Sequence, residues 1–294
     1  MSVILINKVS RSYGTTLAID GLELQVNEGD IYGFIGPNGA GKSTTIRMLL
    51  NFIRPDAGEI SVLDLHPQKD EVQIKKMCGY VSAETFMYPD MKVNELFHFT
   101  ESFHGIHVPE RIEKLCGVLD IDRHKRFREL SFGNRKKISI ACALLHSPRL
   151  LIMDEPTNGL DPVIRNNLYE LLREEQKQGV TIFYSSHVLG EVRRFCSRIG
   201  LIKEGKLIKE SSAEEFIQTG YLHVRIESDA LPEFYNIPGV AGLEREGTHL
   251  QFMFSGDTNL LMQKLASCKL RSVYIEEPDL ENVFMHYFKN ENHD

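Results

Sequence analysis

One glycine-rich segment constrains the fold of this chain more than any other feature. It reads Gly36-Pro37-Asn38-Gly39-Ala40-Gly41-Lys42-Ser43-Thr44 and matches the pattern G-x-x-x-x-G-K-[ST] at every fixed position. Residues 31–35 before it have the apolar pattern of a buried strand, and residues 44–50 after it have that of a helix. This order of strand, loop and helix predicts a phosphate-binding loop for a nucleoside triphosphate.

Each part of this loop suits a phosphate chain. Glycines allow backbone N–H groups to turn inward around the β-phosphate, and the helix N-terminus adds a partial positive charge. Lys42 is placed to reach the β- and γ-phosphates, and the Ser43 hydroxyl to ligate Mg²⁺. We therefore expect residues 36–44 to bind ATP together with Mg²⁺.

The composition argues against a protein whose main task is to hold nucleic acid. The net charge is −7 at pH 7, whereas such proteins normally have a basic balance. The five cysteines form no C-x-x-C pair, which fits a reducing cytosol, and no apolar run reaches about 18 residues. The first residues lack a basic leader and a cleavage site, so we expect the protein to stay in the compartment where it is made.

Strand and helix patterns alternate along most of the chain, which predicts an α/β fold with a mostly parallel sheet. Strand patterns occur at 3–6, 22–26, 31–35, 150–154 and 180–184, and a hairpin pattern follows at 199–208. Between them, helical periodicity predicts a helical subdomain at about 86–147. Its first helix has one apolar face, formed by Val93, Leu96, Phe97, Phe99 and Phe103.

The pattern changes near residue 220, where we place a domain boundary. Residues 221–227, 250–254 and 270–275 have strand patterns, and residues 260–265 and 280–288 have helical ones. We expect residues 1–220 to form the nucleotide-binding domain. Residues 221–294 then form a small α+β accessory domain without visible chemistry.

Two adjacent carboxylates end the strand pattern at 150–154. Asp154 is expected to hold Mg²⁺ through water, because a strand end near the phosphate loop is where a metal-facing acid belongs. Glu155 is expected to polarise the water that attacks the γ-phosphate. Paired acids at a strand end also occur on ordinary surfaces, so the prediction depends on their combination with the phosphate loop.

The segment Leu130-Ser131-Phe132-Gly133-Asn134 lies directly before another helical pattern. With the phosphate loop upstream and the two acids downstream, it resembles the L-S-G-G-Q signature of the ATP-binding cassette family. The resemblance covers roughly residues 4–210. It implies a P-loop NTPase cassette, with a mixed β-sheet core and a helical subdomain, followed here by the small C-terminal α+β domain.

In that family two cassettes close face to face over two ATP molecules. The resemblance implies that Ser131 and Gly133 contact the γ-phosphate bound by the other subunit, although Ser131 alone would be read as a helix cap. Asp161 falls in the family's dimer-contact loop, and His187 falls where a histidine contacts the γ-phosphate and fixes the attacking water. Tyr13 resembles the ring on which adenine stacks, with core packing as the alternative.

Two departures from the family pattern affect the predicted site. Phe132 and Asn134 stand where the signature usually has glycine and glutamine, which places the turnover rate in doubt. Ala83 stands where the family supplies a metal-contacting glutamine, and its methyl group cannot ligate Mg²⁺. Either Glu84 takes that place through a shifted loop, or a water molecule does.

The resemblance also implies partners. It indicates the ATP-hydrolysing subunit of a transporter at the cytoplasmic face of the membrane, with separate transmembrane permease subunits and a second cassette subunit in a homodimer or heterodimer. Residues 86–90 lie where a permease helix would dock, and residues 277–284 resemble the C-terminal extension of exporter and drug-resistance subunits.

Two other functions are known for proteins with cassette motifs or are suggested by this sequence. Cassette proteins that act on nucleic acid or in translation carry two cassettes in one chain or a long coiled-coil insertion, and neither is present here. Phe132 and Ala83 suggest a nucleotide-gated regulatory module without turnover. Glu155 and His187 favour an active ATPase instead, and no nucleic-acid partner is expected.

Overall fold

The computed structural model describes residues 1–218, 222–228 and 237–276. These residues form two compact units. The N-terminal unit comprises Met1–His187 and Arg194–Ser212, and the C-terminal unit comprises Val188–Arg193 and the chain from Ala213 onward.

A six-stranded sheet forms the centre of the N-terminal unit, with the strand order β5-β6-β7-β3-β8-β9. Its pairs are parallel except the last, β8 with β9, which is an antiparallel hairpin. Strands β3, β6 and β7 are buried at every position, as expected for continuous apolar runs covered on both faces. The strands are β3 (Ile31–Ile35), β5 (Cys78–Val81), β6 (Leu150–Asp154), β7 (Thr181–Ser186), β8 (Arg198–Lys203) and β9 (Lys206–Ser212).

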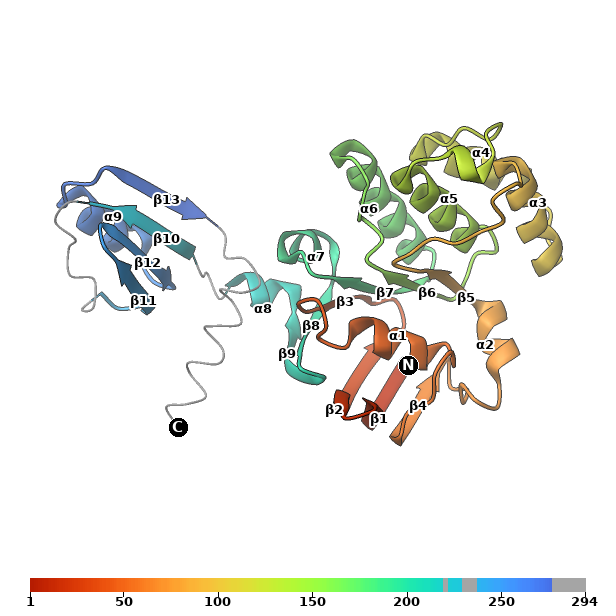
Figure 1. Cartoon of the computed structure of the whole chain (residues 1–294), viewed down its shortest axis with the longest axis horizontal. Helices are drawn as coiled ribbons and strands as arrows, with labels where there is room; N and C mark the ends of the chain where they lie inside the picture. Colours follow the sequence, from red (N-terminus) through yellow and green to blue (C-terminus); the bar gives the residue numbers. More distant parts are fainter. Residues whose placement is uncertain (219–221, 229–236, 277–294) are drawn as a thin grey trace. The chain divides into compact units, whose positions relative to one another are not determined.

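A second, antiparallel sheet has the order β2-β1-β4. Helix α1 contacts β2 and β4 of this sheet and β6 of the central sheet, so it lies between the two sheets (Figure 1). Apolar residues from both sheets and α1 form one core, which includes Ile4, Ile46 and Ile152. The elements are β1 (Ser2–Tyr13), β2 (Thr16–Asn27), β4 (Ala57–Val62) and α1 (Lys42–Leu49).

The helical part lies on the other side of the central sheet (Figure 1). Helix α5 is buried around most of its circumference because β5 contacts one side of it and α3 and α4 contact others. Helix α6 begins with Asp161 as its cap and Pro162 as its first residue. The helices of the N-terminal unit are α2 (Glu71–Met77), α3 (Val93–His104), α4 (Pro109–Leu119), η1 (Phe127–Glu129), α5 (Phe132–Leu144) and α6 (Pro162–Lys177).

The C-terminal unit contains a four-stranded antiparallel sheet with the order β11-β12-β10-β13. Alternate residues of β10 and β12 pack on Leu261 and Leu265 of α9, which forms a small apolar core. The chain also forms α7 (Leu189–Phe195), α8 (Ala213–Gln218), β10 (Leu222–Glu227), β11 (Val240–Glu246), β12 (His249–Phe254), α9 (Thr258–Ala266) and β13 (Ser272–Glu276).

The predicted fold class, an α/β cassette core with a helical part and a small α+β unit, is confirmed. Strands β1 and β2 are longer than predicted, and β4, α2, β5, α7 and β11 were missed. The predicted apolar face of the first helix is partly wrong, because Phe99 and Phe103 are exposed. The helix predicted at 280–288 lies outside the described residues.

Candidate functional site

The phosphate loop connects β3 to α1, as the motif predicts. Gly41 has a φ of 109°, and a Cβ there would lie 2.5 Å from Cδ1 of Ile19 and 2.9 Å from the carbonyl oxygen of Ala18. An L side chain would therefore meet both backbone strain and a steric clash. Glycine lets the chain turn here so that α1 begins at Lys42 with its N-terminus directed at the loop.

Lys42 is buried and its ammonium group is fully engaged. Its Nζ donates to the carbonyl oxygens of Gly36 at 2.6 Å and Pro37 at 3.1 Å. The same Nζ lies 3.3 Å from Oε1 of Glu155. The structure thus joins the phosphate loop directly to the predicted catalytic carboxylate.

Asp154 and Glu155 end β6, beside the end of β7. The Ser185 hydroxyl donates to Oδ1 of Asp154 at 2.6 Å, and the backbone N–H of Glu155 donates to the same hydroxyl at 3.2 Å. Glu155 has a left-handed backbone with φ 49°, which is rare for a residue with a Cβ. Ser185 therefore fixes both acids, a role that sequence reasoning missed.

The Glu155 carboxylate collects partners from three segments. Besides Lys42, it accepts a hydrogen bond from Nδ2 of Asn158 at 3.1 Å and bonds to Nδ1 of His187. His187 directly follows β7 in sequence. Lys42, Glu155 and His187, predicted separately as site residues, therefore meet at one carboxylate.

The signature segment begins α5 and packs against the loop that precedes α6. Ser131 caps α5, with its hydroxyl accepting from the Asn134 N–H at 3.3 Å, and Asp161 caps α6. A Cβ on Gly133 would lie 2.2 Å from the carbonyl oxygen of Gly159, so the two segments are in close contact. Within this chain, Ser131 and Asp161 bond to the helices that they begin rather than to Lys42 or Glu155.

Tyr13 lies at the end of β1, next to the turn at Gly14. Its side chain is 44% exposed, and the Arg11 guanidinium carbon lies 5.2 Å from the ring centroid. The ring is thus outside the core, which removes the alternative of core packing. Its proposed contact with adenine stays a prediction.

Lys136 is a buried residue near the site that sequence reasoning missed. It lies in α5, and its Nζ donates to the carbonyl oxygens of Ser82 at 2.7 Å and Ala83 at 2.6 Å. Burial lowers the pKa of this lysine from 10.5 to about 8, although the charges of Asp154 and Glu155 partly oppose this shift. A lysine on a predicted helix is usually taken to be solvent-exposed, so the sequence does not predict that Lys136 is buried.

The oxygen atoms of Ser43 and Asp154 fit a Mg²⁺ ion. Asp154 is buried at the strand end, and Ser43 lies in the first turn of α1, which contacts β6. Hydroxyl and carboxylate oxygens are ligands that Mg²⁺ prefers, usually together with water and substrate phosphates. Among the described residues, no group of three or more His, Cys, Asp and Glu side chains could hold a metal by itself. Such an ion would thus depend on the nucleotide.

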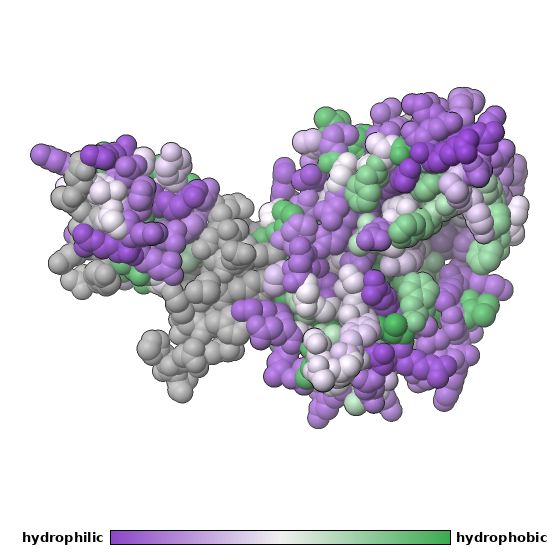
Figure 2. Space-filling model, viewed as in Figure 1, coloured by the Kyte–Doolittle hydropathy of each residue, from purple (hydrophilic) through white to green (hydrophobic). Residues whose placement is uncertain are grey.

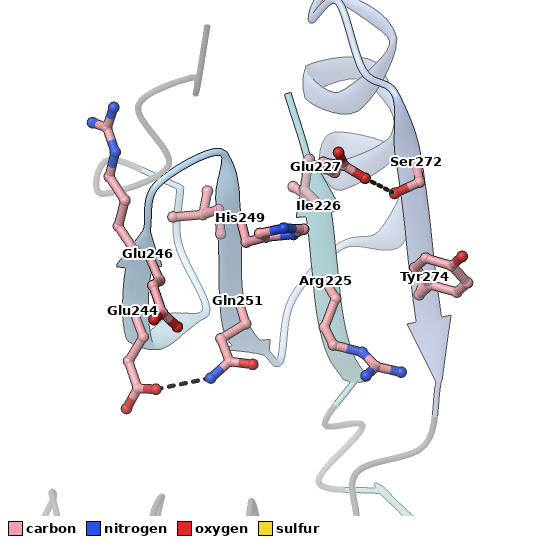
Figure 3. A pocket seen from close by; sticks show the side chains of 11 residues that line it. Arg225, Ile226, Glu227, Glu244, Glu246, His249, Gln251, Ser272 and Tyr274 are labelled. Atoms are coloured by element: carbon pink, nitrogen blue, oxygen red, sulfur yellow. Dashed lines mark hydrogen bonds between the residues drawn. The ribbon is translucent and has the colours of Figure 1, made fainter. Parts of the chain in front are cut away.

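A separate pocket lies on the C-terminal unit, with a volume of about 750 Å³ (Figure 3). It lies on the polar face of the sheet, whose side chains largely bond to one another. Gln251 donates to Glu244 at 2.9 Å, and Ser272 donates to Glu227 at 3.3 Å. Arg225 lies over the Tyr274 ring at 5.6 Å. The phosphate loop, Asp154 and Glu155 all lie in the N-terminal unit, so we place the candidate nucleotide site there and not in this pocket.

Comparisons with known proteins identify the family. Residues 19–158 match the family described as ABC transporter. The chain is 36% identical over 212 residues to the bacitracin transport ATP-binding protein of Bacillus licheniformis, covering 71% of this chain and 69% of the relative. It is 30% identical over 296 residues to the linearmycin resistance ATP-binding protein of Bacillus subtilis, covering 94% of this chain and 95% of the relative.

Solved structures agree on the fold. An ATP-binding subunit of an ABC transporter superposes with a TM-score of 0.67 at 25% identity, covering 72% of this chain and 91% of that one. A dimeric ATP-binding cassette bound to ADP and Pi superposes with a TM-score of 0.66 at 22% identity, covering 71% of this chain and 98% of that one, and shows the fold alone.

The fold and the site define a P-loop ATPase of the cassette type. The chain belongs to the ABC transporter family, as an ATP-binding and ATP-hydrolysing subunit. In the described part of the chain, no helix is both long enough and apolar enough to cross a membrane.

Proposed function

We propose that Glu155 is the carboxylate that polarises the attacking water, and that His187 contacts the γ-phosphate. The observation that carries this assignment is the meeting of Lys42, Asn158 and His187 at the Glu155 carboxylate. One oxygen of that group faces the phosphate-binding lysine, and the other bonds to the histidine. This geometry supports a general base beside the lysine that is proposed to contact the γ-phosphate.

The Lys42–Glu155 ion pair suggests how nucleotide prepares the site. The ammonium group of Lys42 has three N–H donors, and Gly36, Pro37 and Glu155 occupy all three. The β- and γ-phosphates of ATP compete for the same ammonium, so binding releases Oε1 of Glu155 to accept a hydrogen bond from water. We propose that Ser43 and Asp154 hold the accompanying Mg²⁺, with Glu84 as the candidate for a further ligand.

We propose that the chain works as one of a pair of cassettes, either with its own copy or with a sister subunit. Ser131 caps α5 and Gly133 lies in its first turn, and the N-terminus of this helix is proposed to meet an ATP held by the partner. Asp161 caps α6 directly after the loop that packs against Gly133, and we propose that it belongs to the same dimer-contact surface. Tyr13 and residues 36–44 then hold adenine and phosphates of the chain's own ATP.

The membrane partner is proposed to dock beside residues 86–90. Phe86 is 83% exposed and Phe103 is 74% exposed, while Tyr88 packs edge-on against Phe99 at 5.4 Å. Figure 2 shows green surface among purple on the N-terminal unit, including its helical part. Exposed aromatic groups of this kind mark interaction sites. Separate transmembrane permease subunits, with the chain at the cytoplasmic membrane face, are the proposed partners.

Relatives named for bacitracin transport, linearmycin resistance and Nod factor export support an exporter or drug-resistance type of transporter. We also propose that residues 1–220 act as the nucleotide-binding domain. Residues 221–294 then form the accessory domain, which leaves the nucleotide site to the first domain.

Glu155→Gln tests the catalytic assignment. The amide keeps the size of the side chain but cannot take a proton from water, so kcat should fall by about 10²- to 10⁴-fold while ATP binding is retained. Steady-state hydrolysis and nucleotide binding measure the two effects. Glu174→Gln, an exposed change on α6 at a residue paired with Lys114, serves as the control and should hydrolyse normally. Parental turnover in Glu155→Gln would reject the assignment.

A further inference from the structure

Lys136 is a cation without exposed surface, and the proposed mechanism leaves it unused. Its relative exposure is 0%, and two of its three ammonium protons are directed at the carbonyl oxygens of Ser82 and Ala83. A buried charge costs free energy unless it is hydrogen-bonded or paired, and an apolar side chain of similar volume often packs as well. The position therefore calls for an explanation beyond packing.

The segment that Lys136 holds leads from the central sheet toward the helical part. Residues 82 and 83 directly follow β5, which pairs with β6, the strand that ends at Asp154. Ala83 has no polar side chain with which to bond to the rest of the site. The backbone carbonyls bonded to Lys136 thus provide the polar connection of this segment to α5.

On its other side, Lys136 faces the atypical residue of the signature. Its Nζ lies 5.7 Å from the centroid of the Phe132 ring, within the range of a cation–π contact. The ring lies against Gly159, where a Cβ would lie 2.5 Å from Cδ1 of Phe132. The preceding residue, Asn158, donates to Oε2 of Glu155. A continuous series of contacts therefore runs from residues 82–83 to the Glu155 carboxylate.

We propose that Lys136 is a positioning residue for ATP hydrolysis, which fixes Glu155 through Phe132 and the loop at 158–160 and ties that loop to residues 82–83. This inference rests on the proposed role of Glu155. Lys136 touches no reacting atom. Its effect is on the orientation of the carboxylate, and a misplacement of about 1 Å at a reacting group can cost on the order of 100-fold in rate.

The first test compares two neighbouring lysines in the full-length protein. Lys136→Met removes the charge and the donors and keeps the volume. Lys137→Met is the matched control, because Lys137 is also buried, at 6% exposure, but bonds to Asp120 at the end of α4. Affinity is measured with trinitrophenyl-ATP, and kcat and KM by phosphate release.

We expect Lys136→Met to lower kcat by about tenfold or more, with nucleotide affinity within about twofold of the parental value. Lys136→Arg keeps a charged donor and should recover most of the kcat. Equal losses of kcat in the two methionine variants would overturn the proposal, as would a change in KM without a change in kcat.

The second test is a double-mutant cycle with Phe132→Leu, which alters a half-exposed side chain and so leaves the fold intact even if Lys136→Met does not fold. Phe132→Leu alone should lower kcat several-fold at unchanged affinity. Combined with Lys136→Met, its loss should differ from the product of the single losses by at least about threefold. Independent effects of the two changes would overturn the proposed connection. Where Lys136→Met does not fold, parental kcat in Phe132→Leu would overturn it.

The two proposals fail in different ways. If Glu155→Gln hydrolyses ATP at the parental rate, the catalytic assignment fails, whatever the lysine variants do. If Glu155→Gln is inactive while Lys136→Met and Phe132→Leu retain parental kcat, the catalytic assignment stands and the positioning role of Lys136 is rejected.

Discussion

The two units of the chain differ in where they keep their charges. The N-terminal unit buries Lys42, Lys136, Asp154 and Glu155, each held by named polar partners. In the C-terminal sheet and α9, the Lys, Arg, Asp and Glu side chains remain at least partly exposed, and the core is apolar. Buried charges oppose folding unless they are partnered. Some buried charges of the N-terminal unit, such as Glu101 and Glu175, lie outside the candidate site. The contact of Lys42 with Glu155, rather than burial of charge alone, therefore marks the site.

The largest expected effect tests whether the apolar core of the C-terminal unit is separate from nucleotide binding. Phe252 is almost fully buried there, and Phe252→Ala should lower the free energy of unfolding of this unit by about 3–5 kcal/mol. Hydrogen exchange should show weaker protection in β10 and β12, with ATP-dependent protection of residues 36–50 unchanged. Val273→Ala, at a partly exposed position of β13, is the control and should cost under about 1 kcal/mol. Loss of ATP binding in Phe252→Ala would show that the two units are not independent in nucleotide binding.

A second prediction sharpens the contrast between a buried and an exposed cation. Lys42→Ala should weaken ATP binding by about 2–4 kcal/mol, on the order of 100-fold, because a buried charge facing the phosphates is lost. Arg225→Ala in the C-terminal unit removes an exposed cation paired with Glu276 and should leave ATP affinity unchanged. Titration with a fluorescent ATP analogue compares them, and equal effects would contradict the assignment of the site.

The smallest effect concerns a buried titratable group in the N-terminal unit that lies outside the site. Burial, and then the neighbouring His104, lower the pKa of His146 from 6.5 to about 4. Below pH 6.5 the unfolded chain binds a proton at this position that the folded chain refuses. The stability contributed by neutral His146 is therefore complete above pH 6.5 and is lost as the pH falls toward 4.

His146→Gln should reduce the loss of unfolding free energy between pH 7 and pH 4.5 by roughly 1–2 kcal/mol, after allowance for the partial exposure of the ring. Urea unfolding at pH 7 and at pH 4.5 measures the difference. His124→Gln, at an exposed position, is the control. If the pH dependence of the unfolding free energy were unchanged in His146→Gln but reduced in His124→Gln, the assignment of this pH dependence to His146 would be wrong.

The sequence predicted those parts of the site that local motifs encode. The phosphate loop, the acids at the end of β6 and His187 after β7 lie at one edge of the sheet because consecutive parallel strands end there. Ser185 and Lys136 were missed, because their roles depend on contacts with residues far away in sequence. A serine in a buried strand and a lysine in a helix are common in proteins without any functional role, so neither residue type points to a site.

The fold was predicted where periodicity is strong and missed where it is weak. Helix α4 buries the residues that its helical spacing places on one face, including Ile112 and Leu119. Phe99 and Phe103 of α3 also follow helical spacing and are exposed. Periodicity records which residues share a face, but it does not tell whether that face meets the core or a partner. Short elements such as β4 and α2 contain too few periodic positions to stand out.

The left-handed backbone at Glu155 places the proposed catalytic residue in a conformation that lowers the stability of the folded chain. A glutamate in this conformation costs on the order of 1 kcal/mol that glycine would not, and asparagine tolerates it better as well. Glycine or asparagine here would relieve that strain but would also remove the carboxylate that partners the buried Lys42 ammonium, Asn158 and His187. The strained glutamate is therefore retained by its partners as well as by its proposed role in hydrolysis. A lineage that no longer turned over ATP would first need another partner for Lys42 before position 155 could drift.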